Sequence, residues 1–298
     1  MAQVEAVATV TVATPRRAPM STAWLGVVPF FSFATLFLLL PTAYLVVGAF
    51  QDGEGRFTLA NLAGLWEPGI RSAYLISLEV SAASAVLGAL FGFALAWAVV
   101  LGGLPRWIRP VLMTFSGVAS NFAGLPLAFA FITTLGRTGL VTTLLQSLLG
   151  FSLYRTGFNI LSFSGLTLTY LYFQIPLMVL ILTPALDGLK REWGEAASIL
   201  GASTFTYWRL VVIAILWPSL LGTTLLLFAN SFGAIATAYG LTGSTLNLVT
   251  ILLYAQIRGD VLHDPHLGYA LALGMVAITG ASNALYIYLR TRSERWLR

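Results

Sequence analysis

Three amide side chains stand inside long apolar stretches of this sequence, where hydrogen-bonding groups are costly. They are Asn121, Gln174 and Asn230. A polar group at membrane depth costs several kcal/mol unless it is paired or faces water. Because an amide donates and accepts hydrogen bonds without carrying charge, it suits either the passage of a polar solute or the joining of two helices. We therefore expect none of the three to face lipid.

Each amide lies close to a residue that disrupts a helix. The disrupting residues are Gly124, Pro126, Pro176 and Gly233. Broken helices at membrane depth are tolerated where they line a cavity or are covered by protein. The pattern predicts a polar chamber inside the membrane. We assign to it Asn121, Tyr170, Gln174, Asn230 and Ser231. For any single amide, a hydrogen bond that joins two helices is the alternative, and both interpretations stay open.

Glu79 is the single acidic residue inside these stretches. An intramembrane carboxylate is a candidate contact for a cationic substrate. Its place near the outer end of its stretch favours a structural role, in which it reaches the interface or pairs with Arg71 or Arg155. Small residues recur at helical spacing on the same stretch and predict close packing against a second helix. They are Ser77, Ser81, Ala85, Gly88, Gly92 and Ala96.

Signatures of enzymes are absent from the sequence. It contains no His-Glu-x-x-His motif, no nucleophile elbow and no glycine-rich phosphate loop that ends in Lys-Ser or Lys-Thr. The run His263-Asp264-Pro265-His266 has three ligand types, but its proline and short spacing disfavour convergence on one metal ion. Cysteine is absent as well. We expect no catalytic residue, no metal site and no cofactor bound by this chain.

The composition defines the class of protein. Hydrophobic residues make up 58% of the chain, charged residues only 9%, and the mean hydropathy is +0.86, which lies outside the range of soluble domains. The net charge of +5 does not indicate nucleic acid as a partner, because the basic residues fall in short loops beside apolar segments. The expected partner surface is a lipid bilayer.

Six apolar segments are long enough to cross a bilayer as helices. We place them at 24–49, 73–101, 108–135, 160–186, 211–232 and 267–290. The expected fold class is therefore all-α integral membrane, a bundle of six transmembrane helices in one domain at 24–290. Tails at 1–23 and 291–298 flank it, and the apolar segment 245–257 is too short to span and predicts a helix packed at the outer face.

The basic residues set the orientation. With both termini in the cytoplasm, eleven of the sixteen basic residues lie inside and five outside, the asymmetry that the positive-inside rule expects. The five outer residues are Arg56, Arg71, Arg137, Arg155 and Arg258. This orientation places the long loop at about 187–210 in the cytoplasm.

That cytoplasmic loop is longer than a connection between two membrane helices requires. It contains helix formers and then Gly201, so it predicts two short helices broken at that glycine. Phe205, Tyr207 and Trp208 would then offer an aromatic face. An interfacial connector, with the aromatic residues at headgroup level, is the alternative.

The loop resembles the EAA loop of permease subunits of ABC importers, in which Glu-Ala-Ala is followed after three residues by glycine and later by a proline-containing apolar stretch. The matching residues are Glu195, Ala196, Ala197, Gly201, Val211, Ile213 and Pro218. We include Ala202, which follows the glycine, in the coupling loop. Ala214 stands where the family usually has its first proline, which implies a less kinked start of the fifth span.

The resemblance extends from about residue 70 onward and implies the fold of a type I importer permease. In that family the loop is a coupling helix seated in a cleft of a cytoplasmic ATPase dimer, which binds the ATP and Mg²⁺. The resemblance also implies a second permease subunit, an extracytoplasmic substrate-binding protein and a place in the bacterial plasma (inner) membrane. Glu195 would pair with the ATPase surface, and Gly201 would permit the turn.

Three short runs resemble the spermidine/putrescine branch, which pairs two different permeases and implies a heterodimer with a polyamine or similar small solute as substrate. They are residues 119–126, Phe173-Gln174-Ile175-Pro176 and Asn230-Ser231-Phe232-Gly233. A stand-alone ion-coupled carrier or channel is the alternative function. Such a carrier is expected to place paired ionisable groups near the bilayer midplane, and the first and the third to sixth predicted spans contain none.

Overall fold

The computed structural model describes residues 23–258 and 264–294, in two compact units that divide between Tyr44 and Leu45. The first unit holds α1 (Ala23–Ala34), a π-helical turn at Thr35–Leu39 and the start of α2 (Leu40–Gly48). Its large apolar side chains are exposed. Phe30, for example, is 68% exposed and Phe37 is 66% exposed. Exposure of this kind suits contact with lipid, and the segment Gly26–Gly48 is long enough to span a bilayer.

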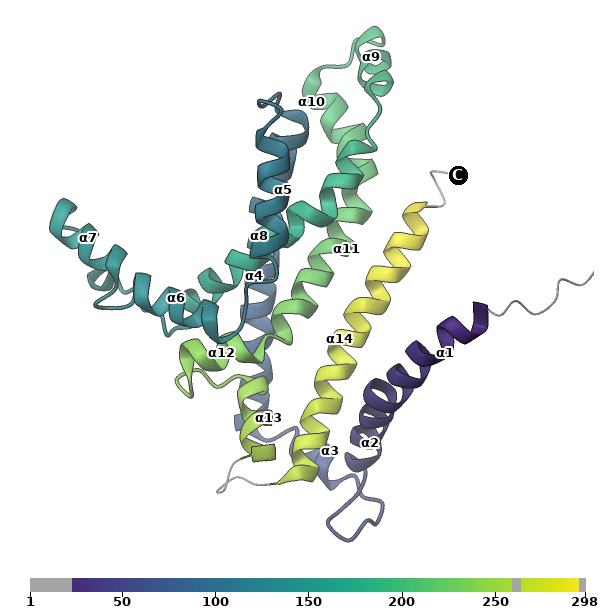
Figure 1. Cartoon of the computed structure of the whole chain (residues 1–298), viewed down its shortest axis with the longest axis vertical. Coiled ribbons are helices and arrows are strands. Elements are labelled where there is room, and N and C mark those ends of the chain that lie inside the picture. The colour runs from purple at the N-terminus through teal and green to yellow at the C-terminus, as the bar shows by residue number, and fades with distance from the viewer. Residues whose placement is uncertain (1–22, 259–263, 295–298) are drawn as a thin grey trace, which may run out of the picture. The chain divides into compact units, whose positions relative to one another are not determined.

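The second unit is a helical bundle (Figure 1). Its long helices are α4 (Pro68–Leu101), α8 (Phe163–Asp187), α11 (Ile213–Phe232) and α14 (Pro265–Glu294). Helix α4 packs against α8 and α11, and α11 packs against α14. The shorter helices are α3 (Ala60–Gly64), α5 (Ile108–Ala119), α6 (Leu125–Leu135), α7 (Leu140–Leu149), α9 (Arg191–Ile199), α10 (Thr204–Tyr207), α12 (Ile235–Thr242) and α13 (Val249–Arg258). Figure 1 shows α9 and α10 at one end of this bundle and α3 and α13 at the other.

Six helical segments within the described residues are long and apolar enough to cross a membrane, which confirms the predicted class. They are Gly26–Gly48, Pro68–Leu101, Leu125–Leu149, Phe163–Asp187, Thr204–Phe232 and Pro265–Leu289. The fifth begins earlier than predicted, because α10 continues through a π-helical turn at Trp208–Val212 into α11.

The third predicted span, 108–135, is wrong as a single helix. The chain breaks between α5 and α6, and the third long apolar segment starts at the break and extends through α7. Gly124 has φ 78° and ψ −154°, a conformation that only glycine adopts without strain. Pro126 lies in the first turn of α6, where its missing N–H costs no helical hydrogen bond. These two residues stop one helix and start another.

The predicted stripe of small residues on α4 is confirmed as a packing surface, since all six of its members are buried. Its glycines bring the α8 backbone close. A Cβ atom at Gly92 would lie 2.5 Å from Met178 Cβ and 2.9 Å from the Ile175 carbonyl oxygen. At Gly88 it would lie 2.8 Å from Gln174 Cβ. The close contact between α4 and α8 therefore depends on residues without side chains.

Gly92→Leu is expected to destabilise the bundle, because a leucine cannot enter this contact unless the two helices separate. Overpacking of this kind costs about 1–3 kcal/mol or more. Gly117→Leu on α5 is the matched control, because a Cβ there meets nothing within 4 Å. Thermal unfolding in detergent should show a lower transition temperature for the first variant alone. Equal losses in both variants would contradict the packing argument.

The apolar segment 245–257 contains α13, so the predicted short helix is confirmed. Helix α13 packs against α14 and α4, and Ser77 Oγ on α4 accepts a hydrogen bond of 2.9 Å from Val249 N in its first turn. This bond satisfies a buried helix N-terminus that would otherwise lack a partner. The predicted tail at 1–23 and the end of the tail at 291–298 lie mostly outside the described residues, while α14 continues to Glu294.

Candidate coupling loop and membrane pocket

Helix α9 follows α8 after a three-residue connection and contains the Glu-Ala-Ala run. It ends in a Schellman turn, in which Gly201 N donates to Ser198 O at 3.0 Å and Ala202 N donates to Ala197 O at 2.9 Å. Gly201 has φ +77°, in the left-handed region that favours glycine. Ser203 then caps α10, because its Oγ accepts a hydrogen bond from Thr206 N. The predicted pair of short helices broken at Gly201 is confirmed.

The apolar residues at the end of α9 point away from the protein. Ile199 and Leu200 are each 86% exposed, and Phe205 on α10 is 74% exposed. We call these three residues the apolar cap. They lie at the end of the bundle marked by α9 and α10 (Figure 1). Helix α9 is not among the membrane-spanning segments, whereas Phe205 lies at the start of the segment Thr204–Phe232. Exposed large apolar side chains that lie together in this way mark a surface for contact with another protein or with a membrane.

Glu195 and Ala196 on α9 are also exposed, whereas Ala197 and Ala202 are partly buried under the turn. Sequence reasoning named the Glu-Ala-Ala run and missed Ile199 and Leu200. The sequence did contain a signal for their exposure, which is their position just before the glycine. A helix that ends at this glycine leaves its last side chains exposed to solvent.

The predicted aromatic face is wrong as a single surface. Phe205 is exposed, but Tyr207 and Trp208 are partly buried and pack against the core of the bundle. Trp208 meets Trp97 near the end of α4 edge to face, with ring centroids 5.4 Å apart. The ring of Tyr207 lies against Gly194 of α9. These two aromatic residues therefore attach the coupling loop to the bundle.

A pocket of about 290 Å³ opens where two broken helices meet. One break separates α5 from α6, and the other separates α11 from α12 at Gly233 and Ala234. The pocket is lined by Ser120, Ala123, Gly124, Phe173, Asn230, Gly233, Ala234, Ile235, Ala236 and Thr237. None of these residues is charged, and the polar groups come from hydroxyls, one amide and backbone.

A hydrogen bond of 2.7 Å joins the two breaks, from Gly124 N to the hydroxyl oxygen of Thr237. Thr237 is buried, and it lies in the first turn of α12. The bond therefore fixes the start of α6 against the start of α12, side by side at the pocket.

Thr237→Val is expected to destabilise this junction, because the shape is kept while the Gly124 N–H loses its acceptor. An unsatisfied buried donor costs about 1–3 kcal/mol. The transition temperature in detergent should fall for Thr237→Val and stay near the wild-type value for Thr237→Ser, which keeps the hydroxyl. A serine variant as unstable as the valine variant would show that the methyl group, and not the hydrogen bond, matters.

The residues predicted to line one chamber lie in different places in the structure. Asn230 lines the pocket, and Asn121 lies on the same break but is exposed and donates to Gly117 O at 2.9 Å. Gln174 is fully buried between α4 and α8, where its Nε2 donates to Ser84 Oγ at 3.0 Å. Among the described residues, its Oε1 has no hydrogen-bond partner. Gln174 thus joins two helices, the alternative that the sequence left open.

Tyr170 and Ser231 are also buried, next to the pocket and not in its lining. The hydroxyl of Tyr170 donates to Ala234 O at 3.1 Å, and Ser231 Oγ donates within α11 to Leu227 O at 3.1 Å. Both side chains border a small second cavity between α4, α8 and α11. They support the backbone around the second break.

Glu79 is exposed on α4, and the described residues provide no ion pair for it. Neither pairing predicted for it forms, since Arg71 lies over the ring of Trp66, 6.0 Å from its centroid, and Arg155 makes no ion pair in the described part of the chain. In the run at 263–266, His263 lies outside the described residues. Asp264 Oδ1 accepts hydrogen bonds from His266 N and Leu267 N, so it caps the start of α14.

The fold defines a multi-pass helical membrane protein with exposed apolar side chains at one end of its bundle. No family model matches the chain. Its sequence is 25% identical over 270 residues to the sulfate transport system permease protein CysW of Synechococcus elongatus, covering 89% of this chain and 88% of that protein. It is 29% identical over 214 residues to the molybdenum transport system permease protein ModB of Mycobacterium tuberculosis, covering 71% and 76%.

The chain is also 23% identical over 275 residues to the spermidine/putrescine transport system permease protein PotB of Haemophilus influenzae, covering 90% of this chain and 92% of that protein. Its fold matches a bacterial alginate ABC transporter solved in complex with a periplasmic protein, with a TM-score of 0.68, 13% identity and coverage of 92% and 94%. The chain thus resembles transport-system permease subunits over most of its length, and those relatives are transporter subunits and not enzymes.

Proposed function

We propose that this chain forms half of the translocation pathway of an ATP-driven importer and that α9 is its coupling helix. The observation that carries the proposal is the apolar cap, Ile199, Leu200 and Phe205, whose side chains are exposed shortly after the Glu-Ala-Ala run at one end of the bundle. A separate ATPase dimer that holds ATP and Mg²⁺ would cover the cap, with Glu195 paired to its surface. Burial of two or three such side chains suffices to anchor a helix in a groove.

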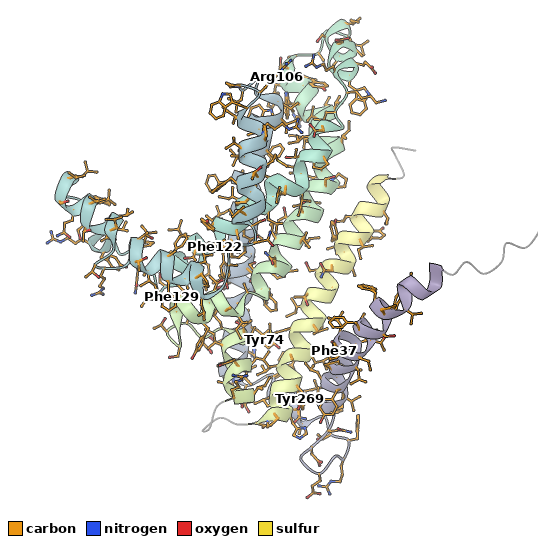
Figure 2. All side chains as sticks on the ribbon, in the orientation of Figure 1. Phe37, Tyr74, Arg106, Phe122, Phe129 and Tyr269 are labelled. Atoms are coloured by element: carbon orange, nitrogen blue, oxygen red, sulfur yellow. The ribbon has the colours of Figure 1, made fainter. Side chains whose placement is uncertain are left out.

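We place this chain in the inner membrane of a bacterium. The charge distribution supports an orientation in which the coupling loop and both termini lie in the cytoplasm. Figure 2 labels Arg106 at the end of the bundle where α9 lies, and Arg191 is the first residue of α9. Arg56 and Arg71 flank α3 in the sequence, and α3 lies at the other end (Figure 1). This asymmetry follows the positive-inside rule. The outer end would then receive substrate from an extracytoplasmic binding protein.

The second half of the pathway would come from another permease subunit. We propose a heterodimer, as the resemblance to the polyamine branch implies. The pocket between the two helix breaks is our candidate segment of the pathway, because unwound backbone at membrane depth persists where it lines a cavity.

The cargo is a small polar solute. A polyamine is the substrate expected from the sequence, but a dication gains no carboxylate from the pocket, whose lining contains no Asp or Glu. An oxyanion, such as the relatives named for sulfate and molybdenum carry, would meet hydroxyls, backbone N–H groups and the Asn230 amide. We therefore propose an oxyanion as the second candidate substrate, favoured by this lining.

Co-purification with a candidate ABC ATPase from the same organism tests the function. The complete importer should hydrolyse ATP faster when the loaded binding protein is present, and proteoliposomes should accumulate substrate only with ATP. Transport by this chain alone, without a bound ATPase, would overturn the proposal in favour of a stand-alone ion-coupled carrier or channel.

Uptake by the complete importer separates the two candidate substrates. Radiolabelled putrescine, spermidine, sulfate and molybdate should be offered singly, and then each as a competitor of the others. Saturable uptake of an oxyanion that polyamines do not inhibit supports the lining argument. Uptake of a polyamine alone would return the substrate to the class expected from the sequence.

A further inference from the structure

Helix α5 connects the root of the coupling loop with the membrane pocket. It runs from Ile108 to Ala119, about 18 Å at 1.5 Å per residue. Figure 2 labels Arg106 just before the start of α5 and Phe122 just beyond its other end. Ser120, the residue after the helix, lines the pocket. A displacement of α5 along its axis would therefore reach the pocket directly.

An ion pair joins α5 to the last residue of α8. Arg109 Nη2 lies 2.5 Å from Asp187 Oδ2, and the two residues are 78 positions apart. The other ion pairs in the described residues lie within the single loop at 52–56. Asp187 directly precedes the connection to α9. The one ion pair between different helices of the described chain thus stands at the root of the coupling loop.

The position of Asp187 makes this partner important. A carboxylate at the C-terminus of a helix is repelled by the partial negative charge there, whereas a nearby cation offsets that repulsion. Arg109 supplies the cation. One turn further in, the Thr183 hydroxyl of α8 lies 3.7 Å from Met113 Sδ of α5, and Met113 packs against the same core cluster as Leu186. The end of α8 and the start of α5 are therefore held as one body.

We propose that the Arg109–Asp187 pair transmits the movement of the coupling helix to α5, and through α5 to the helix break that lines the pocket. Arg109 and Asp187 are positioning residues, since neither touches the pocket or the apolar cap. The inference rests on the proposed function and adds the path between its two sites. That path runs from α9 through Asp187, Arg109 and Ser120 to the bond between Gly124 and Thr237.

Charge removal tests the proposal on the complete importer in proteoliposomes, with the transported substrate and ATP hydrolysis measured together. Arg109→Gln and Asp187→Asn should still assemble with the ATPase, but transport per ATP should fall about threefold to fivefold, which is what an exposed ion pair can contribute. The exchanged pair Arg109→Asp/Asp187→Arg should recover most of the loss. Arg106→Gln is the matched control, because it removes a neighbouring arginine that makes no ion pair in the described structure.

The outcomes separate this proposal from the proposed function. If the wild-type importer couples normally and both single variants keep its transport per ATP, the transmission path is wrong. An equal loss in Arg106→Gln overturns it too, because the effect would follow charge at this surface and not the pair. A wild-type chain that never assembles with an ATPase instead defeats the proposed function.

A second variant decides the case in which the single changes prevent folding. The chain has no cysteine, so Arg109→Cys/Asp187→Cys introduces two unique thiols. A short thiol-reactive crosslinker applied to the assembled importer should raise transport per ATP toward the wild-type value. Crosslinking that leaves the ratio unchanged would overturn the transmission path.

Discussion

Replacing Ile199 and Leu200 together with aspartate is expected to separate this chain from the ATPase that we propose as its partner. The two side chains are each 86% exposed, so they support little of the permease fold itself. Burial of a large apolar side chain contributes about 1.5–3 kcal/mol. Loss of both would weaken the complex by roughly 3–6 kcal/mol, a factor on the order of 10²–10⁴ in the dissociation constant. The measurement is ATPase retained on the tagged permease during purification, with transport in proteoliposomes beside it.

Phe57→Asp is the matched control for this variant. Phe57 is 75% exposed and also apolar, but it lies in the loop at the opposite end of the bundle. It should retain the ATPase at the wild-type level. A permease that keeps its ATPase with aspartate at both 199 and 200 would show that the apolar cap is not the docking surface.

Hydropathy sufficed to predict the fold class and five of the six spans, because an apolar segment of bilayer length has few alternatives to a helix. The third span was wrong as drawn, although the sequence marked Gly124 and Pro126 as disruptors. Hydropathy averages over a window and does not register a one-residue break. The left-handed φ of Gly124 and its bond to Thr237 depend on α12, more than a hundred residues further along the chain.

The amides show why a site is harder to predict than a span. Asn121, Gln174 and Asn230 share one chemistry, and the sequence does not say which face of a helix each occupies. The position of Gln174 is determined by its contact with Gly88 of α4. Because Gly88 has no side chain, the glutamine can enter the interface between α4 and α8. Asn230 lies one residue before Ser231, which faces the core, so its own side chain turns toward the pocket.

The coupling loop was the most predictable part of the site, since its turn chemistry is local. Gly201 and the helix before it follow from residues close in sequence. The Arg109–Asp187 pair could not be predicted in the same way, because its members are 78 residues apart and each alone is an ordinary charge near a helix end. Long-range pairs emerge only when the helices are packed.

Gly201→Val is the second change expected to have a large effect. At φ +77° the left-handed conformation costs a residue with a Cβ about 1–2 kcal/mol of conformational free energy, and it costs a β-branched residue more. The Schellman turn should therefore open in this variant. The apolar cap would then lose its fixed position relative to α9. We expect transport to fall about tenfold or more, since each 1.4 kcal/mol corresponds to a factor of ten. ATP-driven uptake by proteoliposomes, normalised to the amount of assembled importer, is the measurement.

Gly201→Asn separates the turn from the docking contact. Asparagine tolerates the left-handed region and is found at this turn position, whereas valine is not. A Cβ at Gly201 meets no atom within 4 Å, so within this chain the two variants differ in backbone preference and not in space. Asn should keep most of the transport that Val loses. Equal losses in both would mean that the ATPase surface itself occupies the space beside Gly201, and the glycine would then be required for close approach and not for its φ angle.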